Sequence, residues 1–310
     1  MVLVFNGVVQ NAPPPNLHAF LQTNPEIREQ SEKFLEIPTK TVGPHGLLYV
    51  HQGELAVTEP NDSNVEVLGS DDATTCIIAV LRHPVCGAVA LSHMDGGGVA
   101  DCVARMIESV KQIAGGSSDG KMELQVFGAF GYAQNFSETV FASVMITFHK
   151  HPEKVNVTLA CVGDINTTVK DGKHWPSLYG VGINVKTGEL FPAVYKDRGP
   201  DEGLRHARQL CSKLRMMEVY NNETRMLKIG PFDYSPLDDA EMWLNLPDEV
   251  ILRYMSTSPE VEPPHFVSQI RKALKCMLDH PSPINTIFKF NKPRCYVRDE
   301  TNNGWVLVKK

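Results

Sequence analysis

The chain has 310 residues, of which 42% are hydrophobic and 21% are charged, a composition typical of one large globular domain or two small ones. The net charge is −6 and the pI is near 6.0. We therefore expect no nucleic-acid partner, because nucleic-acid-binding domains usually carry a strongly basic surface.

The first ten residues have no basic region and become polar again at Asn6, which is not the pattern of a signal peptide. No segment has the ~18 consecutive apolar residues that a membrane helix needs, so we expect no membrane partner. Seven cysteines without an export signal fit a reducing compartment with free thiols. No CxxC pair, HExxH motif or nucleotide-binding glycine motif occurs, so the sequence predicts no metal and no organic cofactor.

Several segments show the start signals, apolar spacing or end signals of helices. The clearest has a stripe formed by Val99, Val103, Met106, Ile107 and Val110. The predicted helices cover residues 23–37, 99–116, 137–151, 199–214 and 265–280.

Short apolar segments separated by turn residues predict the strands. Strands outnumber helices and alternate with them, so we predict an α+β fold with mostly antiparallel sheets. No linker or internal repeat is visible, which favours one domain over residues 1–310. The proline content of residues 260–310 makes this segment a candidate peripheral arm of the same domain. The predicted strands lie within residues 46–60, 64–70, 76–82, 87–93, 121–133, 155–166, 178–196 and 217–230.

Two apolar strands, 76–82 and 87–93, are separated by a four-residue connection with a proline and therefore predict an antiparallel hairpin. If Arg82 pairs with Gly87, then Cys76 lies opposite His93. Directly opposed side chains share a face of the sheet, with Cβ atoms ~4.5–5.5 Å apart. The register is an assumption, since a slip of one residue would send the two side chains to opposite faces.

A cysteine beside a histidine is a candidate nucleophile. A free thiol has a pKa of ~8.5, and a neighbouring imidazole can accept its proton to form a thiolate–imidazolium pair. A third group should orient the ring, and the backbone N–H groups of Thr75 and Cys76 could hold an oxyanion. The alternative is structural, because cysteine is one of the residues most often buried in protein cores.

The remaining cysteines and histidines lack this pattern. Cys86 lies in the predicted turn, Cys102 on a helix and Cys161 in a strand, so each is expected to be a core or surface thiol. No nucleophile is paired in the sequence with the three other histidines considered, which are His174, His206 and His265.

Several segments together resemble the protein N-terminal asparagine amidohydrolases over residues ~40–290. The two most specific are LGSDDATTC and the STSP…EPPHF segment. The others are TVGPHGLLYVHQGELAVTEP, LYGVGINVKTGEL, DRGPDE and IGPF.

The resemblance places the chain with the cysteine deamidases of the cytotoxic-necrotizing-factor kind, including the bacterial chemoreceptor glutamine deamidases. It implies an α-β-β sandwich and a triad of Cys76, His93 and Ser70. Thr74 and Thr75 are rivals for the orienting role of Ser70, which otherwise reads as an ordinary turn serine. The segment LQVFGAFG is similar to the glycine-rich loop of these deamidases, with Ala129 where glycine is common.

The implied reaction converts the side-chain amide of an N-terminal asparagine into aspartate and ammonia through a thioester. The aspartate would feed arginylation and ubiquitin-dependent degradation, in a monomer located in the cytoplasm or the nucleus. A carboxylate should bind the α-ammonium group, and Asp71, Asp72 and Asp95 are the candidates nearest in sequence. The alternatives are another cysteine-dependent amidase or thiol peptidase, and a non-enzymatic binding module that docks through SPEVEPPHF.

Overall fold

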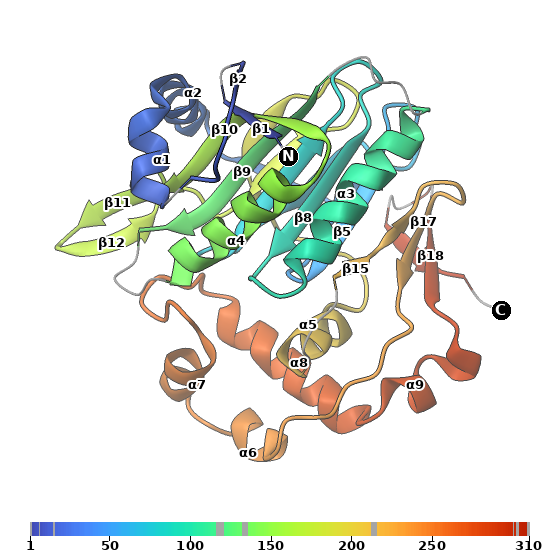
Figure 1. Cartoon of the computed structure of the whole chain (residues 1–310). Helices are drawn as coiled ribbons and strands as arrows, with labels where there is room; N and C mark the ends of the chain where they lie inside the picture. The colour runs from blue at the N-terminus through green and yellow to red at the C-terminus, as the bar shows by residue number, and fades with distance from the viewer. Residues whose placement is uncertain are drawn as a thin grey trace.

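Two β-sheets pack against each other, and helices cover the outer face of the larger sheet (Figure 1). The structure is a computed structural model that describes residues 2–5, 7–14, 16–115, 121–131, 136–211, 216–299, 301 and 304–308.

The larger sheet has eight strands in the order β15-β5-β8-β7-β9-β10-β1-β2. Its central strands β5, β8, β7 and β9 are antiparallel in succession, whereas β9, β10 and β1 run parallel. The strands are β1 Val2–Phe5, β2 Val8–Val9, β5 Glu54–Thr58, β7 Ile77–Arg82, β8 Val89–Met94, β9 Met122–Phe130, β10 Lys154–Gly163 and β15 Met217–Glu218.

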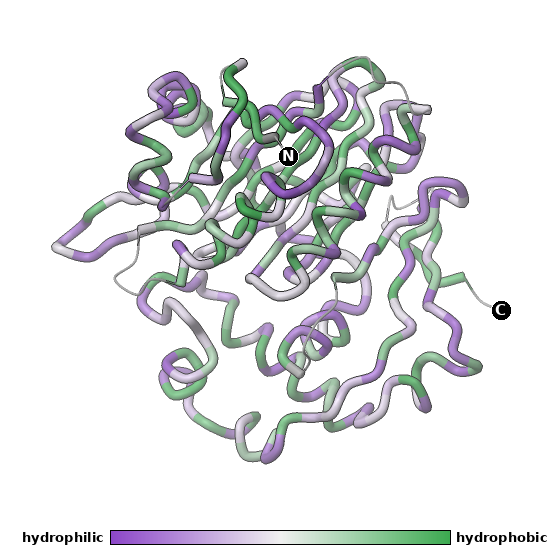
Figure 2. Tube along the Cα trace, viewed as in Figure 1, coloured by the Kyte–Doolittle hydropathy of each residue, from purple (hydrophilic) through white to green (hydrophobic). Residues whose placement is uncertain are grey.

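One face of this sheet is covered by α1 (Leu17–Thr23), α3 (Val99–Ile113) and α4 (Phe136–Lys150). The predicted apolar stripe of α3 is buried against the sheet, and Figure 2 shows how hydrophobic and hydrophilic residues alternate along this helix. Burying such a stripe is the main source of stability for a surface helix.

The second sheet covers the other face, and its order is β3-β14-β13-β6-β4. Leu48, Leu68 and Val181 from this sheet join Ile78 and Leu91 from the larger one in a single buried cluster. The layers are therefore helices, sheet and sheet, which confirms the predicted α-β-β sandwich. Over all the sheets of the described residues, ten antiparallel strand pairings outnumber five parallel ones. The strands are β3 Lys40–Val42, β4 Leu47–Tyr49, β6 Val67–Ser70, β13 Val181–Asn184 and β14 Leu190–Tyr195.

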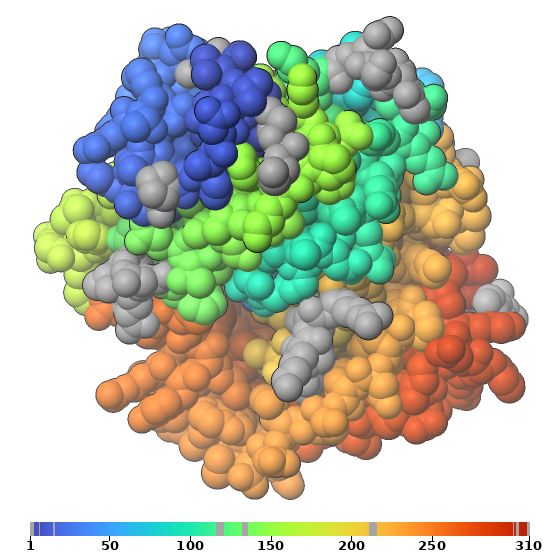
Figure 3. All heavy atoms as spheres, in the orientation of Figure 1, coloured from blue at the N-terminus to red at the C-terminus, as the bar shows by residue number. Residues whose placement is uncertain are grey.

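The C-terminal third packs below these layers, as its orange and red atoms show in Figure 3. Here α5 (Glu202–Cys211) lies beside α8 (Phe266–Asp279). Ala273, Leu274 and Met277 of α8 are buried in the same cluster that lies between the sheets. The domain boundaries and the peripheral arm stay predictions.

The remaining elements form a four-stranded antiparallel sheet, a two-stranded hairpin and short helices. They are β11 Thr167–Lys170, β12 Lys173–Pro176, β16 Tyr220–Asn221, β17 Met226–Ile229, β18 Arg294–Arg298, β19 Trp305–Leu307, α2 Pro25–Leu35, α6 Ala240–Leu244, α7 Asp248–Met255, α9 Pro283–Thr286 and the 3-10 turn Lys289–Asn291.

All five predicted helices are present, as α2, α3, α4, α5 and α8. The predicted ends at residues 116 and 212–214, and the last residues of the strand predicted over 121–133, lie outside the described residues. The helix α1 was not predicted. Its N-cap is Asn16, whose side chain accepts a hydrogen bond from the N–H of Ala19 at 2.7 Å, a usual signal for a helix start.

Within the described ranges, no helix combines the length and the apolar character needed to cross a lipid bilayer.

Candidate active site

The β7–β8 hairpin exists, but its register differs from the predicted one. Arg82 pairs with Val89, and Ile78, not Cys76, lies opposite His93. The predicted pairing is wrong because Gly87 belongs to the loop: its φ is +76° and its N–H donates to the carbonyl of His83 at 2.8 Å. The first pair beyond the loop is therefore His83 with Ala88, whose carbonyl accepts from the His83 N–H at 2.8 Å.

The displacement keeps Cys76 and His93 on the same face, because it moves Cys76 from the place opposite His93 to a diagonal place. Cys76 comes directly before β7, and its side chain joins the same cluster as Ile78 and Val80. Diagonal neighbours on an antiparallel ladder lie roughly 7–8 Å apart, which long side chains can span. Both side chains line one cavity of about 250 Å³.

His93 is held in place by Ser70, the last residue of β6 in the second sheet. The hydroxyl oxygen of Ser70 lies 2.8 Å from Nδ1 of His93, and both side chains are buried. The other ring nitrogen, Nε2, is buried and has no hydrogen-bond partner in the part of the chain that the structure describes. The imidazole is therefore fixed at one nitrogen and available at the other.

The backbone at Cys76 is fixed by the glycine-containing segment that ends β9. The N–H of Ala129 donates to the carbonyl of Cys76 at 2.8 Å, and Phe130 donates to Thr74 at 3.1 Å. Gly128 has φ +106°, and a Cβ added there would lie 2.2 Å from the carbonyl oxygen of Cys76. Only glycine allows this close approach, whereas Ala129 tolerates φ +40°.

The environment keeps both reacting groups neutral in the ligand-free protein. Burial raises the pKa of the Cys76 thiol far above its ordinary value, and the negative charges of Asp95 and Glu262 raise it further. Burial lowers the pKa of His93 to about 4. Both shifts favour a thiol and a neutral imidazole over a thiolate–imidazolium pair.

The N–H groups of Thr75 and Cys76 were predicted to hold an oxyanion. Neither donates to a backbone carbonyl in the turns and loops of the described residues. The side chains of Thr75 and Thr74 are engaged by a distant segment: Thr75 bonds Thr257 at 2.9 Å, and Thr74 accepts from Ser258 at 2.8 Å. The two threonines that were rivals for the place of Ser70 therefore brace the nucleophile segment, while Ser70 contacts His93.

Asp71 and Asp72, two of the predicted substrate-binding residues, are bound by other side chains. Asp71 accepts from Tyr49 at 2.6 Å and from Arg198 at 3.1 Å, and Asp72 accepts from Arg198 at 3.1 Å and is 2.8 Å from Nε2 of His265. Burial and the neighbouring Asp72 raise the pKa of Asp71 to about 6. Although burial opposes it, the bonds from His265 and Arg198 lower the pKa of Asp72.

Asp95 and Glu262 are the other carboxylates that line the cavity. Asp95 accepts hydrogen bonds from Gln52 at 3.0 Å and from the N–H of Gly97 at 2.9 Å. Glu262 accepts from Ser256 and Ser258. Burial raises the pKa of Glu262 to about 7. Neither carboxylate forms a salt bridge within the described residues, although Arg208 lies close enough to Asp95, and His265 close enough to Glu262, to act on it electrostatically.

Arg198, Glu262 and His265 were not among the predicted site residues. They lie in DRGPDE and STSPEVEPPHF, two of the segments on which the family resemblance rests. The motifs therefore pointed to the segments that contain these three residues. The second segment contains SPEVEPPHF, the docking segment of the alternative hypothesis, and contributes Ser256, Thr257 and Glu262 to the lining of the cavity.

Among the described residues, no group of three or more histidine, cysteine, aspartate or glutamate side chains is arranged to hold a metal ion.

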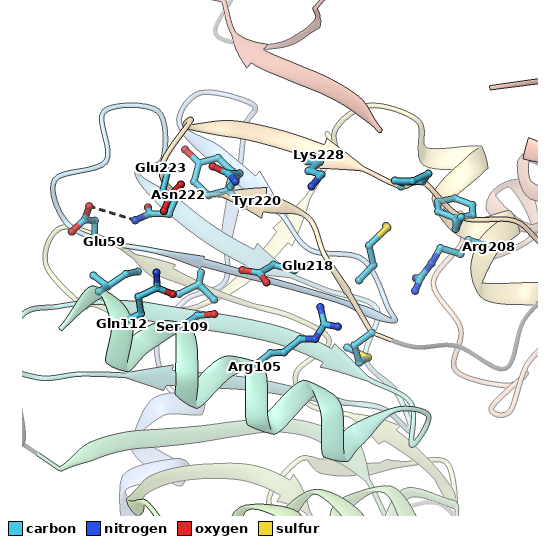
Figure 4. Close-up of a pocket in the computed structure, with 18 of the residues that line it drawn as sticks. Glu59, Arg105, Ser109, Gln112, Arg208, Glu218, Tyr220, Asn222, Glu223 and Lys228 are labelled. Atoms are coloured by element: carbon cyan, nitrogen blue, oxygen red, sulfur yellow. Dashed lines mark hydrogen bonds between the residues drawn. The ribbon is translucent and has the colours of Figure 1, made fainter. Parts of the chain in front are cut away.

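A larger hollow of about 900 Å³ lies between α3 and the β15–β17 region (Figure 4). Arg105 of α3 and Glu218 of β15 line it, and Asn222 donates to Glu59 at 3.5 Å at its edge. None of the described residues that line it is a cysteine or a histidine, so the smaller cavity is the candidate for thiol chemistry.

The three other cysteines for which a core or surface position was predicted lie in such positions. Cys102 and Cys161 are buried and Cys86 is exposed, and all three are free thiols.

Comparison with known proteins shows what the chain is similar to. A family described as protein N-terminal asparagine amidohydrolase matches residues 37–307. Proteins of that name from Homo sapiens and Sus scrofa are 37% and 38% identical over 287 residues, which cover 93% of this chain and 92% of each relative. The protein of that name from Arabidopsis thaliana is 27% identical over 88% of this chain and 84% of its own length. The chain therefore belongs to the protein N-terminal asparagine amidohydrolase family.

Proposed function

We propose that this cavity hydrolyses the side-chain amide of an N-terminal asparagine to aspartate and ammonia, with Cys76 as nucleophile, His93 as acid and base, and Ser70 as the orienting residue. One observation carries this proposal. His93 is bound by Ser70 at Nδ1 and unpartnered at Nε2, in the same cavity as Cys76. Family membership gives the substrate, since the relatives are named for acting on an N-terminal asparagine.

The reaction runs in two halves. As the sulfur of Cys76 attacks the amide carbon, its proton passes to Nε2 of His93, and the N–H groups of Thr75 and Cys76 stabilise the oxyanion. His93 then donates this proton to the amide nitrogen, the C–N bond breaks, ammonia leaves and a thioester remains. Water attacks the thioester and gives a proton to His93, the C–S bond breaks, and the proton returns to the sulfur.

The hydrogen on Nδ1 of His93 has a defined role in this scheme. For Nε2 to accept the thiol proton, the neutral ring must carry its hydrogen at Nδ1, because a neutral imidazole has one N–H. Nδ1 then donates to the hydroxyl oxygen of Ser70. That bond also stabilises the imidazolium formed during attack, as the carboxylate does in other triads.

The α-ammonium group of the substrate takes part in activating the thiol. Asp95 and Glu262 raise the pKa of Cys76 through their negative charge. They line the cavity and, unlike Asp71 and Asp72, form no salt bridge among the described residues. A cation bound to them offsets that charge and lowers the pKa of the thiol again. Asp71 and Asp72, already bound to Arg198, shape the segment between Ser70 and Cys76.

The test is ammonia release from an asparagine-initiated peptide, together with the mass change of amide to acid. Cys76→Ala should lower the rate by roughly 10⁴-fold or more, and His93→Ala should do the same. Cys102→Ala is the matched control, because it removes another buried thiol outside the cavity. Full activity in Cys76→Ala would rule out the assigned nucleophile.

The same assay separates amide hydrolysis from peptide-bond cleavage, because a thiol peptidase shortens the chain and a deamidase does not. A peptide with an acetylated N-terminal asparagine should not react, since it lacks the α-ammonium group. The aspartate product has a new acidic N-terminus, and we propose that it enters arginylation and ubiquitin-dependent degradation.

A further inference from the structure

Two histidines that have no part in the mechanism above also line the cavity: His206 of α5 and His51, which follows β4. Nδ1 of His51 lies 3.2 Å from Nε2 of His206, and Nε2 of His51 lies 2.9 Å from the carbonyl oxygen of Arg198. The rings meet edge to face, with centroids 4.8 Å apart. A short chain of hydrogen bonds therefore links His206, His51 and the backbone of Arg198.

The chemistry of these groups fixes the position of every hydrogen in the chain. A carbonyl oxygen only accepts, so Nε2 of His51 carries a hydrogen. A neutral imidazole has one N–H, so Nδ1 of His51 is an acceptor. Nε2 of His206 must then donate to it, and Nδ1 of His206 is left with a lone pair.

Both rings stay neutral because they are buried, and a buried cation beside them adds to this effect. The guanidinium of Arg205 donates to the same Arg198 carbonyl at 3.1 Å and pairs with Glu54 at 2.6 Å. Burial first, with the charge of Arg205 adding to it, lowers the pKa of His51 well below its ordinary value. Burial also lowers the pKa of His206 to about 4, so its lone pair persists at neutral pH.

Nδ1 of His206 is buried and has no hydrogen-bond partner among the residues described here. A buried acceptor without a donor is unfavourable, so a ligand that supplies an N–H would satisfy it. His206 and His93 line the same cavity. The unsatisfied lone pair therefore lies near the residue that protonates the leaving nitrogen.

Building on the proposed function, we propose that Nδ1 of His206 accepts an N–H of the substrate's side-chain amide, and that His51 is a positioning residue that fixes the tautomer required. The amide is preferred over the α-ammonium as the donor because Asp95 and Glu262 supply negative charge for the cation. The aspartate product has only acceptor oxygens where the amide nitrogen was, and these oxygens face the lone pair of His206 unfavourably. The site thus binds the amide and releases the acid.

The tautomer can be measured without any substrate, by ¹⁵N NMR of the full chain labelled at histidine. His206 should show an unprotonated Nδ1 and a protonated Nε2, and the signals are assigned by their loss in His206→Leu. His51→Leu removes the acceptor and should change the protonation pattern. His51→Gln keeps an acceptor and a donor and should restore it. A protonated Nδ1 in the unaltered protein would refute the proposal.

Discrimination between amide and acid is the second measurement. It compares kcat/KM for an asparagine-initiated peptide with inhibition by the aspartate-initiated peptide of the same sequence. In His206→Leu we expect kcat/KM to fall about 3- to 10-fold, as for one lost neutral hydrogen bond, while product inhibition becomes tighter. A purely structural defect would weaken both ligands together.

His149→Leu is the matched control, because His149 is also buried with an unpartnered Nδ1 among the described residues but lies on α4 and does not line the cavity. It should leave the discrimination unchanged. The proposal would be overturned if His206→Leu discriminated between the amide and the acid as well as the unaltered protein does. It would also be overturned if His149→Leu lost as much of this discrimination as His206→Leu. Absence of ammonia release from the unaltered protein would instead refute the proposed function, so the two failures can be told apart.

Discussion

The hydroxyl of Ser70 and the imidazole of His93 form a 2.8 Å bond between the two sheets, since Ser70 ends β6 and His93 lies in β8. β6 is held in the smaller sheet by β4 and β13, and β8 is held in the larger one by β5 and β7. The orientation of the imidazole thus depends on how the two sheets are stacked.

Ser70→Ala should lower kcat while leaving the fold intact. The substitution leaves Nδ1 of a buried imidazole without a partner, which costs about 1–3 kcal/mol, or roughly 10- to 100-fold in rate. Steady-state kinetics of ammonia release measure this, with thermal unfolding as a check on folding. An unchanged kcat would show that Ser70 does not orient His93.

Cys76 should react slowly with iodoacetamide near pH 7 in the ligand-free protein. Burial raises the pKa of its thiol, so the reactive thiolate fraction is smaller than for an ordinary cysteine. Cys86 is exposed in the β7–β8 loop and serves as an internal standard. Peptide mapping over time should find Cys86 modified first, and faster labelling of Cys76 would contradict the neutral resting state.

Gly128→Ala should destabilise the protein and reduce activity. The added Cβ would lie 2.2 Å from the carbonyl oxygen of Cys76, at a residue with φ +106°, so the backbone at the nucleophile has to move. We expect a loss of more than about 2 kcal/mol in the free energy of unfolding, measured by urea titration.

Gly172→Ala is the matched control, since Gly172 has φ +75° and open space around it. Only the strain of a left-handed conformation applies there, about 1–2 kcal/mol. Equal effects of the two substitutions would show that the contact with Cys76 is unimportant.

The hairpin shows what sequence can and cannot predict. Apolar patterning places β7 and β8 well, because both strands are buried on both faces. The register depends on the conformation of Gly87, which is set by its bond to His83 and is not visible in the pattern. Cys76 and His93 still share a face, because the error is an even number of residues.

The rest of the site depends on contacts between segments far apart in the chain. Arg198 and His265 contact Asp72 although they lie 126 and 193 residues away in the sequence. Glu262, which also lines the cavity, lies beyond β13 and β14 in the sequence. Local patterns carry no information about such contacts. Motif resemblance pointed to these segments but not to the role of each residue in them.

The stability of Glu262→Gln, measured relative to the unaltered protein, should be greater at pH 8 than at pH 5. Burial raises the pKa of Glu262 to about 7, from an ordinary 4.5, so the folded state holds its proton more tightly than the unfolded state. This group therefore stabilises the fold fully below about pH 4.5, and that contribution is lost as the pH rises through 7. Glutamine does not ionise, so the difference in unfolding free energy between the variant and the unaltered protein should shift by about 1–3 kcal/mol in favour of the variant. Glu260→Gln is the control, at an exposed residue two positions earlier. Its difference in unfolding free energy from the unaltered protein should be the same at both pH values. If Glu262→Gln also showed no change between the two pH values, the carboxyl of Glu262 would ionise as it does in water.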